Sequence, residues 1–445
     1  MSLPFTPDDL AEIGRAAAAD AWEEGLSVLK PDGHVVPIPL VAEPELLSRD
    51  ALAALARESR AILSGAVKLA AALLRRGEAG DREALLGPFE GLEAEAMGRL
   101  FEEAPCPALV ARVDFLRDEH GQPHALELNA TIPAMPGYAD LAAHHWLRAA
   151  AARRGLSPRQ ANELVARQGS NVEKLRETLV AYYRSSGGTR ERPSIAIVAR
   201  PGDAQIGELR RIAAHFRQMG HACENLVPAT CEPERWDVLY RHVWAHNTPA
   251  DAPFARALRA PSRFVLANPV NGLLEAKALF ARLSEAAEDD GLARLAGLDA
   301  EERAAAGRLP WTRLLDASLA PRIVADRERY VLKRSWDYGG KSVHLGSETP
   351  AAEWPGIVER AAADGKGGGF VVQQRIVAAR RPATRVVPDG TAHADLYRDV
   401  STYSGLGPVA PDGSVVRAAA SPVVNILGGG GLAPVIAADV AALLA

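Results

Sequence analysis

Cysteine and long apolar runs are scarce in this sequence, and their scarcity excludes several classes of protein. The chain of 445 residues holds three cysteines, Cys106, Cys223 and Cys231, and no C-x-x-C pair. We therefore expect neither a disulfide framework nor a zinc site. We also expect the protein to lie in a reducing compartment. No segment reaches the roughly 18 consecutive apolar residues of a membrane helix. Acidic residues interrupt the N-terminal segment from Asp8 onward, unlike a signal peptide, so the expected location is the cytoplasm, away from a membrane.

Excess positive charge is also missing. Lys and Arg number 51 against 56 Asp and Glu, a formal net charge of −5, and no dense basic stripe occurs. A protein that binds nucleic acid through its phosphates needs such a stripe, so nucleic acid is not an expected partner. The hydrophobic content of 48% and charged content of 24% are those of a globular protein, and the length predicts more than one domain.

The most informative stretch runs from Ala111 to Asp140. Turn-forming residues at 118–121 separate two segments that alternate as strands do, which predicts a β-hairpin. A turn centred between residues 120 and 121 places Asp114 opposite Glu127 and Arg112 opposite Asn129. Because strand side chains alternate between faces, these four polar groups share one face. The other face is predicted to be core, formed by Val113, Phe115, Leu126 and Leu128.

Two interpretations of this polar face remain open. Carboxylates and an amide oxygen are the ligands that Mg²⁺ prefers, with phosphate oxygens completing its shell, and a guanidinium can hold the anion beside it. Alternatively, the hairpin is simply solvated, and Arg112 and Asp114 pair with Glu127 at the surface. The rigid loop Thr131-Ile132-Pro133-Ala134-Met135-Pro136-Gly137 directly after Asn129 favours the first interpretation.

The rest of the chain divides by its patterns. Helical spacing predicts helices over residues 6–29, 48–76, 140–154 and 157–185. Residues 193–266 alternate strands with a helix, which predicts a small parallel α/β unit, and this unit lacks the G-x-G-x-x-G fingerprint of a dinucleotide site. Further strands are predicted at 329–333, 369–376, 385–387, 394–400, 414–418 and 421–427, and a closing helix at 434–444.

The hairpin motif resembles a known family. R-x-D, then E-x-N thirteen residues after the aspartate, then a Pro/Gly loop is similar to the magnesium hairpin of ATP-grasp ligases such as D-alanyl-D-alanine ligase and glutathionylspermidine synthase. The resemblance implies that Asp114, Glu127 and Asn129 are magnesium ligands. It also implies that Arg112 steadies the phosphates or the developing oxyanion.

Later segments extend the resemblance to ATP binding. The strand ending in Lys333, followed by a loop with Gly339 and Gly340, resembles the family's strand lysine and glycine loop over the triphosphate. Lys277 resembles a second phosphate-binding lysine, although a solvated helix residue is the alternative. The strand with Gln373, Gln374 and Ile376 resembles the hinge that binds adenine. Many relatives carry Glu at the position of Gln374.

The last segment resembles glutathione-synthetase-like enzymes, in which Arg, Asn and a glycine-rich turn precede the magnesium strands. On this resemblance Arg417 and Asn425 face the γ-phosphate or an acyl phosphate, next to the run Gly428–Gly431. The hairpin precedes Lys333 here, whereas most ATP-grasp chains have the reverse order. This is the circularly permuted arrangement of glutathionylspermidine synthase-like proteins.

The expected fold is therefore α+β, a circularly permuted ATP-grasp fold. Four parts are expected: a helical layer (1–104), the metal-binding hairpin with helices of the core (105–190), a Rossmann-like pre-ATP-grasp α/β domain (191–272), and the ATP-binding lobe with the C-terminal part of the core (273–445).

The resemblance implies an ATP- and Mg²⁺-dependent ligase that joins a carboxylate to an amine, or to a thiol, through an acyl phosphate. Two alternatives remain, a kinase with the same site and a non-catalytic ATP-binding module. The residues around Arg241 and His242, with the loop Thr131–Tyr138, are expected near the acceptor substrate. The oligomeric state stays open, with a homodimer as one option.

Overall fold

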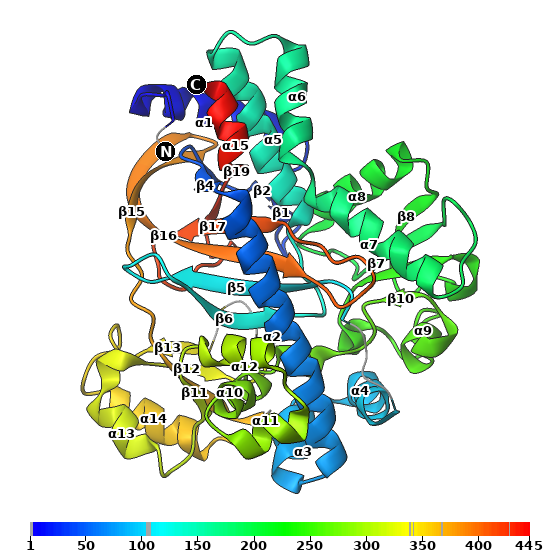
Figure 1. Ribbon diagram of the computed structural model, residues 1–445, viewed down its shortest axis with the longest axis vertical. Helices are drawn as coiled ribbons and strands as arrows, with labels where there is room; N and C mark the ends of the chain where they lie inside the picture. Colours follow the sequence, from blue (N-terminus) through cyan, green and yellow to red (C-terminus); the bar gives the residue numbers. More distant parts are fainter. Residues whose placement is uncertain (1–2, 104–107, 338–339, 341, 366–367, 427) are drawn as a thin grey trace.

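The structure is a computed structural model that describes residues 3–103, 108–337, 340, 342–365, 368–426 and 428–445. Three sheets of four or more strands organise the described residues, and two further sheets have two strands each (Figure 1). Some predicted features lie outside the described residues, namely Cys106, Gly339 and the last residue of the strand predicted at 421–427. Among the described helices, none is long and apolar enough to cross a membrane.

The largest sheet has seven strands and joins the two ends of the chain. Its order is β15-β3-β18-β17-β16-β5-β6. Early strand β5 pairs antiparallel with late strand β16, and β15 also pairs with the first half of β16. The strands are β3 (Leu40–Val41), β5 (Ala111–Arg117), β6 (Pro123–Asn129), β15 (Arg381–Val387), β16 (Gly390–Ser404), β17 (Ser414–Ala419) and β18 (Gly431–Ala433).

Helices cover both faces of this sheet. Figure 1 shows the long helix α2 crossing one face, where Val113, Phe115 and Val400 point into its core. Helices α1 and α5 pack on the other face, the one that carries Tyr403 and Val415. The helices of this part are α1 (Pro7–Glu23), α2 (Arg49–Arg76), α3 (Ala79–Leu86), α4 (Gly91–Glu103), α5 (Pro136–Arg153), α6 (Pro158–Gln168), α7 (Asn171–Ser185) and α15 (Ala438–Ala441).

The predicted α/β unit is confirmed as a parallel sheet in the order β10-β9-β7-β8. Its edge strand β8 escaped prediction because only its first residue is buried, so it has no apolar run. The unit contains β7 (Ile195–Ala199), α8 (Ile206–Gln218), β8 (Cys223–Leu226), β9 (Val238–His242), α9 (Ala255–Arg259) and β10 (Leu266–Ala267).

A third, antiparallel sheet forms a separate lobe, in the order β11-β14-β12-β13. It faces the large sheet from below in Figure 1. Its elements are α10 (Lys277–Ala286), α11 (Asp290–Ala296), α12 (Ala300–Gly307), β11 (Thr312–Leu314), α13 (Ala320–Ala325), β12 (Tyr330–Arg334), β13 (Val343–Leu345), α14 (Trp354–Ala363) and β14 (Phe370–Gln374).

The predicted helix at 48–76 is confirmed. The Ser48 side chain accepts a hydrogen bond from the N–H of Ala51 at 3.1 Å, which caps the first turn. Gly77 ends the helix in the left-handed region with φ +76°.

The prediction that the first hundred residues are purely helical is wrong. The helix predicted to reach residue 29 ends at Glu23, and four short strands follow it. Each strand has at most three residues, too few to show a period. They are β1 (Ser27–Leu29), β2 (Val35–Pro37), β3 and β4 (Glu45–Leu47).

Three later boundaries are also corrected. The helix predicted at 157–185 is two helices, because the first one ends at Gly169, whose φ of +86° is not helical. Residues 421–426 form no strand. The closing helix predicted at 434–444 begins instead as strand β19 (Val435–Ala437), which pairs in parallel with β4. Pairing with a partner almost 400 residues earlier overrides the local helical spacing.

The glycine run allows close packing of the backbone. A Cβ on Gly431 would lie 2.6 Å from the Pro39 carbonyl oxygen, whereas one on Gly428 would meet no atom closer than 3.7 Å. We expect Gly431→Ala to lower the free energy of unfolding by about 1–3 kcal/mol, because the Pro39 backbone must shift. Chemical denaturation of this variant and of the control Gly428→Ala checks it. Equal stability of the two would contradict this explanation.

Candidate functional site

A cleft between the large sheet and the antiparallel lobe brings most of the predicted site residues together. From the large sheet come Asp114, Glu127 and Arg417, and from the lobe come Lys277 and Lys333. The predicted residues that line the cleft are Asp114, Glu127, Lys277, Lys333, Gly340, Gln373, Gln374, Ile376, Arg417 and Asn425. Glu127 and Lys333 therefore share one cleft, although 206 positions separate them in the chain.

The hairpin has the predicted register around its polar residues. Arg112 pairs with Asn129 and Asp114 with Glu127. The register then shifts, so that Phe115 pairs with Ala125 and Leu126 becomes the extra residue of a bulge. The prediction that Leu126 points into the core is wrong, because its side chain lines the cleft and Ala125 takes the core position.

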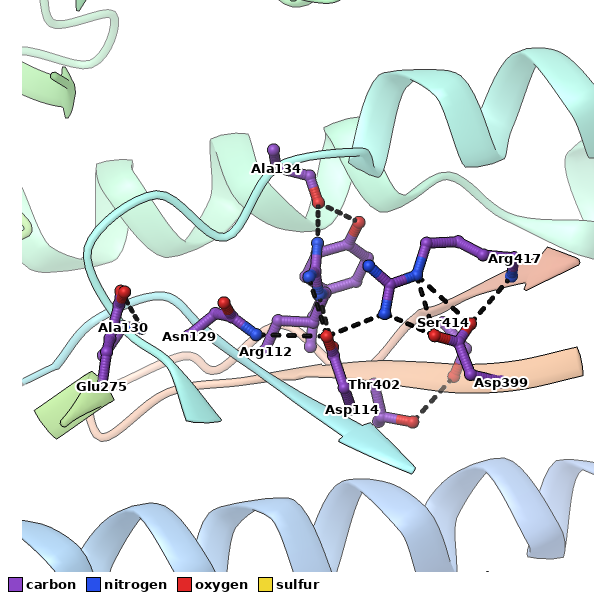
Figure 2. A network of polar contacts seen from close by, with 11 residues as sticks. Arg112, Asp114, Asn129, Ala130, Ala134, Glu275, Asp399, Thr402, Ser414 and Arg417 are labelled. Carbon is purple, nitrogen blue, oxygen red and sulfur yellow. Dashed lines mark hydrogen bonds and ion pairs between the residues drawn. The ribbon is translucent and has the colours of Figure 1, made fainter. Parts of the chain in front are cut away.

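Asp114 is the centre of a buried ionic network on the face of the sheet that carries α5 (Figure 2). Its side chain is 3% exposed. Arg112 binds it with two hydrogen bonds, from Nε at 2.7 Å and from Nη2 at 3.0 Å. The Nη2 of Arg417 donates to the same carboxylate at 2.9 Å, and the amide of Asn129 donates at 3.2 Å. Asp114 is therefore held by groups from three strands.

Asp399 on β16 belongs to this network and was not predicted. Its carboxylate accepts hydrogen bonds from the Nε of Arg417, at 2.9 Å and 3.2 Å, and from the backbone N–H of Arg417 at 3.1 Å. The side chain is buried and lines the cleft. One signal in the sequence could have identified it, because an aspartate stands within a predicted strand, next to the apolar Val400.

The two carboxylates differ in their ionisation. Burial alone would raise the pKa of Asp114, but Arg112 and Arg417 outweigh it and hold that pKa well below its usual range. Burial raises the pKa of Asp399, although Arg417 acts in the opposite direction. Asp114 is therefore the more firmly charged of the two.

The two lysines lie against the acidic side of the cleft. Lys277 Nζ lies 3.9 Å from Glu127 Oε2 and donates to the backbone carbonyl of Asp337 at 3.0 Å. Lys333 Nζ donates to Gln373 Oε1 at 2.7 Å. Burial lowers the pKa of Lys333 to about 8, although Glu127 raises it. Lys333 therefore titrates closer to neutral pH than an ordinary lysine.

Some polar groups of the strand predicted as an adenine hinge bind other parts of the protein. The buried Gln373 side chain contacts Lys333 and also donates to Thr312 Oγ1 at 3.1 Å. The backbone N–H of Gln374 donates to the Trp311 carbonyl at 2.8 Å, so it is not available to an adenine ring. Ile376 follows the end of the strand and lines the cleft.

Arg112 and Asn129 face a second hollow that adjoins the cleft. Glu127, Lys277, Asp337 and Arg417 line both spaces. The other side chains of the hollow come from Trp244, Glu275, Trp336 and Leu128. The hollow therefore continues the cleft beyond the two lysines.

The expectation that Arg241, His242 and the loop Thr131–Tyr138 contribute to an acceptor pocket stays a prediction. None of them is among the described residues that line the cleft or the hollow. Arg241 is fully buried and donates to the backbone carbonyls of Val243, Asn268 and Pro269. The loop is held by Glu208, which accepts from the N–H groups of Met135 and Gly137 at 3.0 Å and 2.9 Å.

The donor set fits a hard cation that shares its shell with a phosphorylated ligand. Asp114 and Glu127 supply two carboxylates on one face, and in the described part of the chain no group of three Asp, Glu, His or Cys could hold a metal ion by itself. Mg²⁺ often binds through one or two carboxylates and substrate phosphates. The lysines on the opposite wall are suited to those phosphates.

No protein-family model matches this sequence, and no curated protein shows significant similarity to it. Among solved structures, the chain is similar to a glutathione synthetase-like effector from Globodera pallida in its apo form. The two share 13% sequence identity, with a TM-score of 0.65 over 98% of this chain and 100% of that one. The fold of this chain is thus a mixed α/β fold like that of the glutathione synthetase-like effector.

Proposed function

We propose that this protein is an ATP-dependent ligase with a circularly permuted ATP-grasp fold that joins a carboxylate to an amine. One observation carries the proposal: acidic residues of the early hairpin and basic residues of the late lobe line the same cleft. The name of the structural neighbour supports it at the level of fold. The proposal keeps the four-part division of the chain at residues 104, 190 and 272.

The acidic side would hold magnesium. Asp114, Glu127 and Asn129 would hold Mg²⁺, which neutralises phosphate charge when it is bound. Asp114 already binds two arginines, so we expect Arg417 to give up part of its contact with Asp114 and to turn toward the ligand while it keeps Asp399.

The lysines and the apolar lining would hold the nucleotide. Lys333 and Lys277 bind phosphate oxygens, and Gln373 holds Lys333 in place through the 2.7 Å hydrogen bond. The adenine ring has an apolar surface in Leu126, Val331, Leu345 and Ile376. Gly340 and Asn425 line the same cleft.

In a reaction of this class, a substrate carboxylate oxygen attacks the γ-phosphorus of ATP, ADP leaves, and an amine then displaces phosphate from the acyl phosphate. The charge that develops on the transferred group lies near Arg112, which the buried Asp114 fixes before the reaction, and near Arg417, which Asp399 holds as it turns toward the ligand. No protein nucleophile is needed, because positioning and charge provide the catalysis.

The decisive experiment measures products. The purified protein is incubated with ATP, Mg²⁺ and mixed pools of carboxylic acids and amines, and ADP release and new masses are followed. An amide product with stoichiometric ADP supports the ligase. A phosphorylated acceptor without an amide would identify a kinase, and ATP binding without turnover on any pool would identify a binding module.

The affinity for nucleotide should depend on the protonation of Lys333. Its pKa is about 8, and only the charged form binds phosphate. As the pH rises from about 7 to about 9, the uncharged fraction increases, so the affinity for Mg–ADP should fall about tenfold. Calorimetric titration of the parent and of Lys333→Arg, which stays charged, checks this. A fall of equal size in both proteins would rule out Lys333 as the titrating group.

A further inference from the structure

The hollow beside the cleft combines aromatic rings with acids. Trp244 and Trp336 are both in its lining and contact each other edge to face, with ring centroids 5.1 Å apart and planes at 90°. Glu275 lies in the same lining. Indole faces and a carboxylate together are the groups that recognise an organic cation.

The cations that line this hollow already have anionic partners. Arg112 binds Asp114, Arg417 binds Asp114 and Asp399, and Lys277 lies 3.9 Å from Glu127. Glu275 differs from the carboxylates in these pairs. Across the residues that the structure describes, no Lys, Arg or His nitrogen lies within 4.0 Å of its carboxylate oxygens. The hollow therefore holds a carboxylate without a salt-bridge partner among the described residues, although Arg241 lies near enough to lower its pKa.

The backbone fixes the position of Glu275. Its Oε1 accepts the N–H of Ala130 at 2.7 Å and also the N–H of Thr131, both directly after β6. Figure 2 shows Glu275 at one end of a row that continues through Asn129, Arg112 and Asp114 to Arg417 and Asp399. Burial raises the pKa of Glu275 to about 7, although these N–H groups lower it. The side chain is half-buried, so a ligand in the hollow can reach it.

We propose that this hollow is the nucleophile subsite, and that it takes an aliphatic primary amine as its ammonium ion, with Glu275 as the ion-pair partner. The inference rests on the proposed ligase function and adds the class of its second substrate. The rings of Trp244 and Trp336 pack against the carbon chain of the amine. An anionic or uncharged nucleophile would leave Glu275 without a partner.

Glu275 then also acts as the base. Its carboxylate takes one proton from the ammonium ion, and the free amine attacks the carbonyl carbon of the acyl phosphate. The C–N bond forms. The bond between the carbonyl carbon and the bridging oxygen breaks, and its electron pair stays on the departing phosphate. The departing phosphate takes the second proton from nitrogen, which leaves a neutral amide, a protonated Glu275 and hydrogen phosphate.

The test measures binding separately from turnover. We expect n-butylammonium to bind saturably in saturation-transfer NMR titrations, with or without Mg–ADP, and n-butanol and butyrate not to bind. Glu275→Gln keeps an oxygen that accepts the two N–H groups but has no charge, so it should weaken n-butylammonium binding about tenfold. The matched control is Glu208→Gln, since Glu208 also accepts two backbone N–H groups, but it is fully buried and does not line the hollow. Its affinity should equal that of the parent.

A second variant guards against misfolding of the first. Trp336→Leu removes an indole face without touching the Ala130–Thr131 backbone and should also weaken n-butylammonium binding. Parental affinity in Glu275→Gln, or no saturable binding to the parent under either condition, would overturn the inference. Binding through Glu275 without ADP release on any acid pool would instead overturn the ligase function and leave the amine site standing.

Discussion

Glu127→Ala should reduce Mg²⁺-dependent ADP release by at least about a hundredfold, because the cleft loses one of the two carboxylates that face the lysines across it. Glu127 is the more exposed of the two, and no arginine contact among the described residues competes for it. Its removal should therefore leave the buried network around Asp114 intact. Steady-state ADP release at saturating acid, amine and ATP measures the effect, and thermal unfolding verifies the fold.

The matched control for this experiment lies on the same hairpin. Glu119→Ala removes the same charge at the exposed turn, where the side chain is 65% exposed and its one ion pair among the described residues is a 3.9 Å contact with His120. Its activity should match that of the parent. If Glu127→Ala retained the full rate, the assignment of this hairpin to magnesium would be wrong.

Arg417→Met should destabilise the protein by about 3–5 kcal/mol, because it leaves two buried carboxylates without their shared cation. Asp114 would keep Arg112, but Asp399 would lose its cationic partner. The pKa of the Asp399 carboxyl, which burial already raises, should rise further above its value in the unfolded chain. The folded state would then bind more protons than the unfolded one, so the loss of stability should be largest at neutral pH and shrink as the pH falls. Urea denaturation at several pH values measures this.

A second substitution separates lost charge pairing from lost packing. In Arg417→Met with Asp399→Asn, the uncompensated charge is gone, and most of the stability should return. Activity should not return, since the guanidinium is missing from the cleft. Equal destabilisation of the single and double variants would show that packing of the arginine, and not its charge, holds the sheet together.

Short-range patterns explain the parts of the site that could be predicted. The alternation of Arg112 and Asp114, followed by Glu127 and Asn129, predicted their cross-strand pairing because a tight turn determines register over a few residues. The bulge at Leu126 could not be predicted in this way. It depends on how β5 and β6 fit between the sheet core and the cleft, which no local period encodes.

Asp399 and Glu275 mark the limit of such reasoning within the site. Each is a single acidic residue without a motif. Asp399 gains its role from Arg417 on the neighbouring strand, and Glu275 from N–H groups that lie 145 and 144 positions away. Long-range contacts of this kind leave no trace in local spacing.

By itself the sequence determined the long helix from its Ser48 cap, the polar face of the hairpin and the parallel α/β unit, because helix caps, turns and alternating apolar residues act over a few positions. Only the tertiary structure decided that β5 pairs with β16, that residues 435–437 form a strand on β4, and that Arg417 lies between Asp114 and Asp399. In those cases burial and pairing with distant partners outweigh local preference.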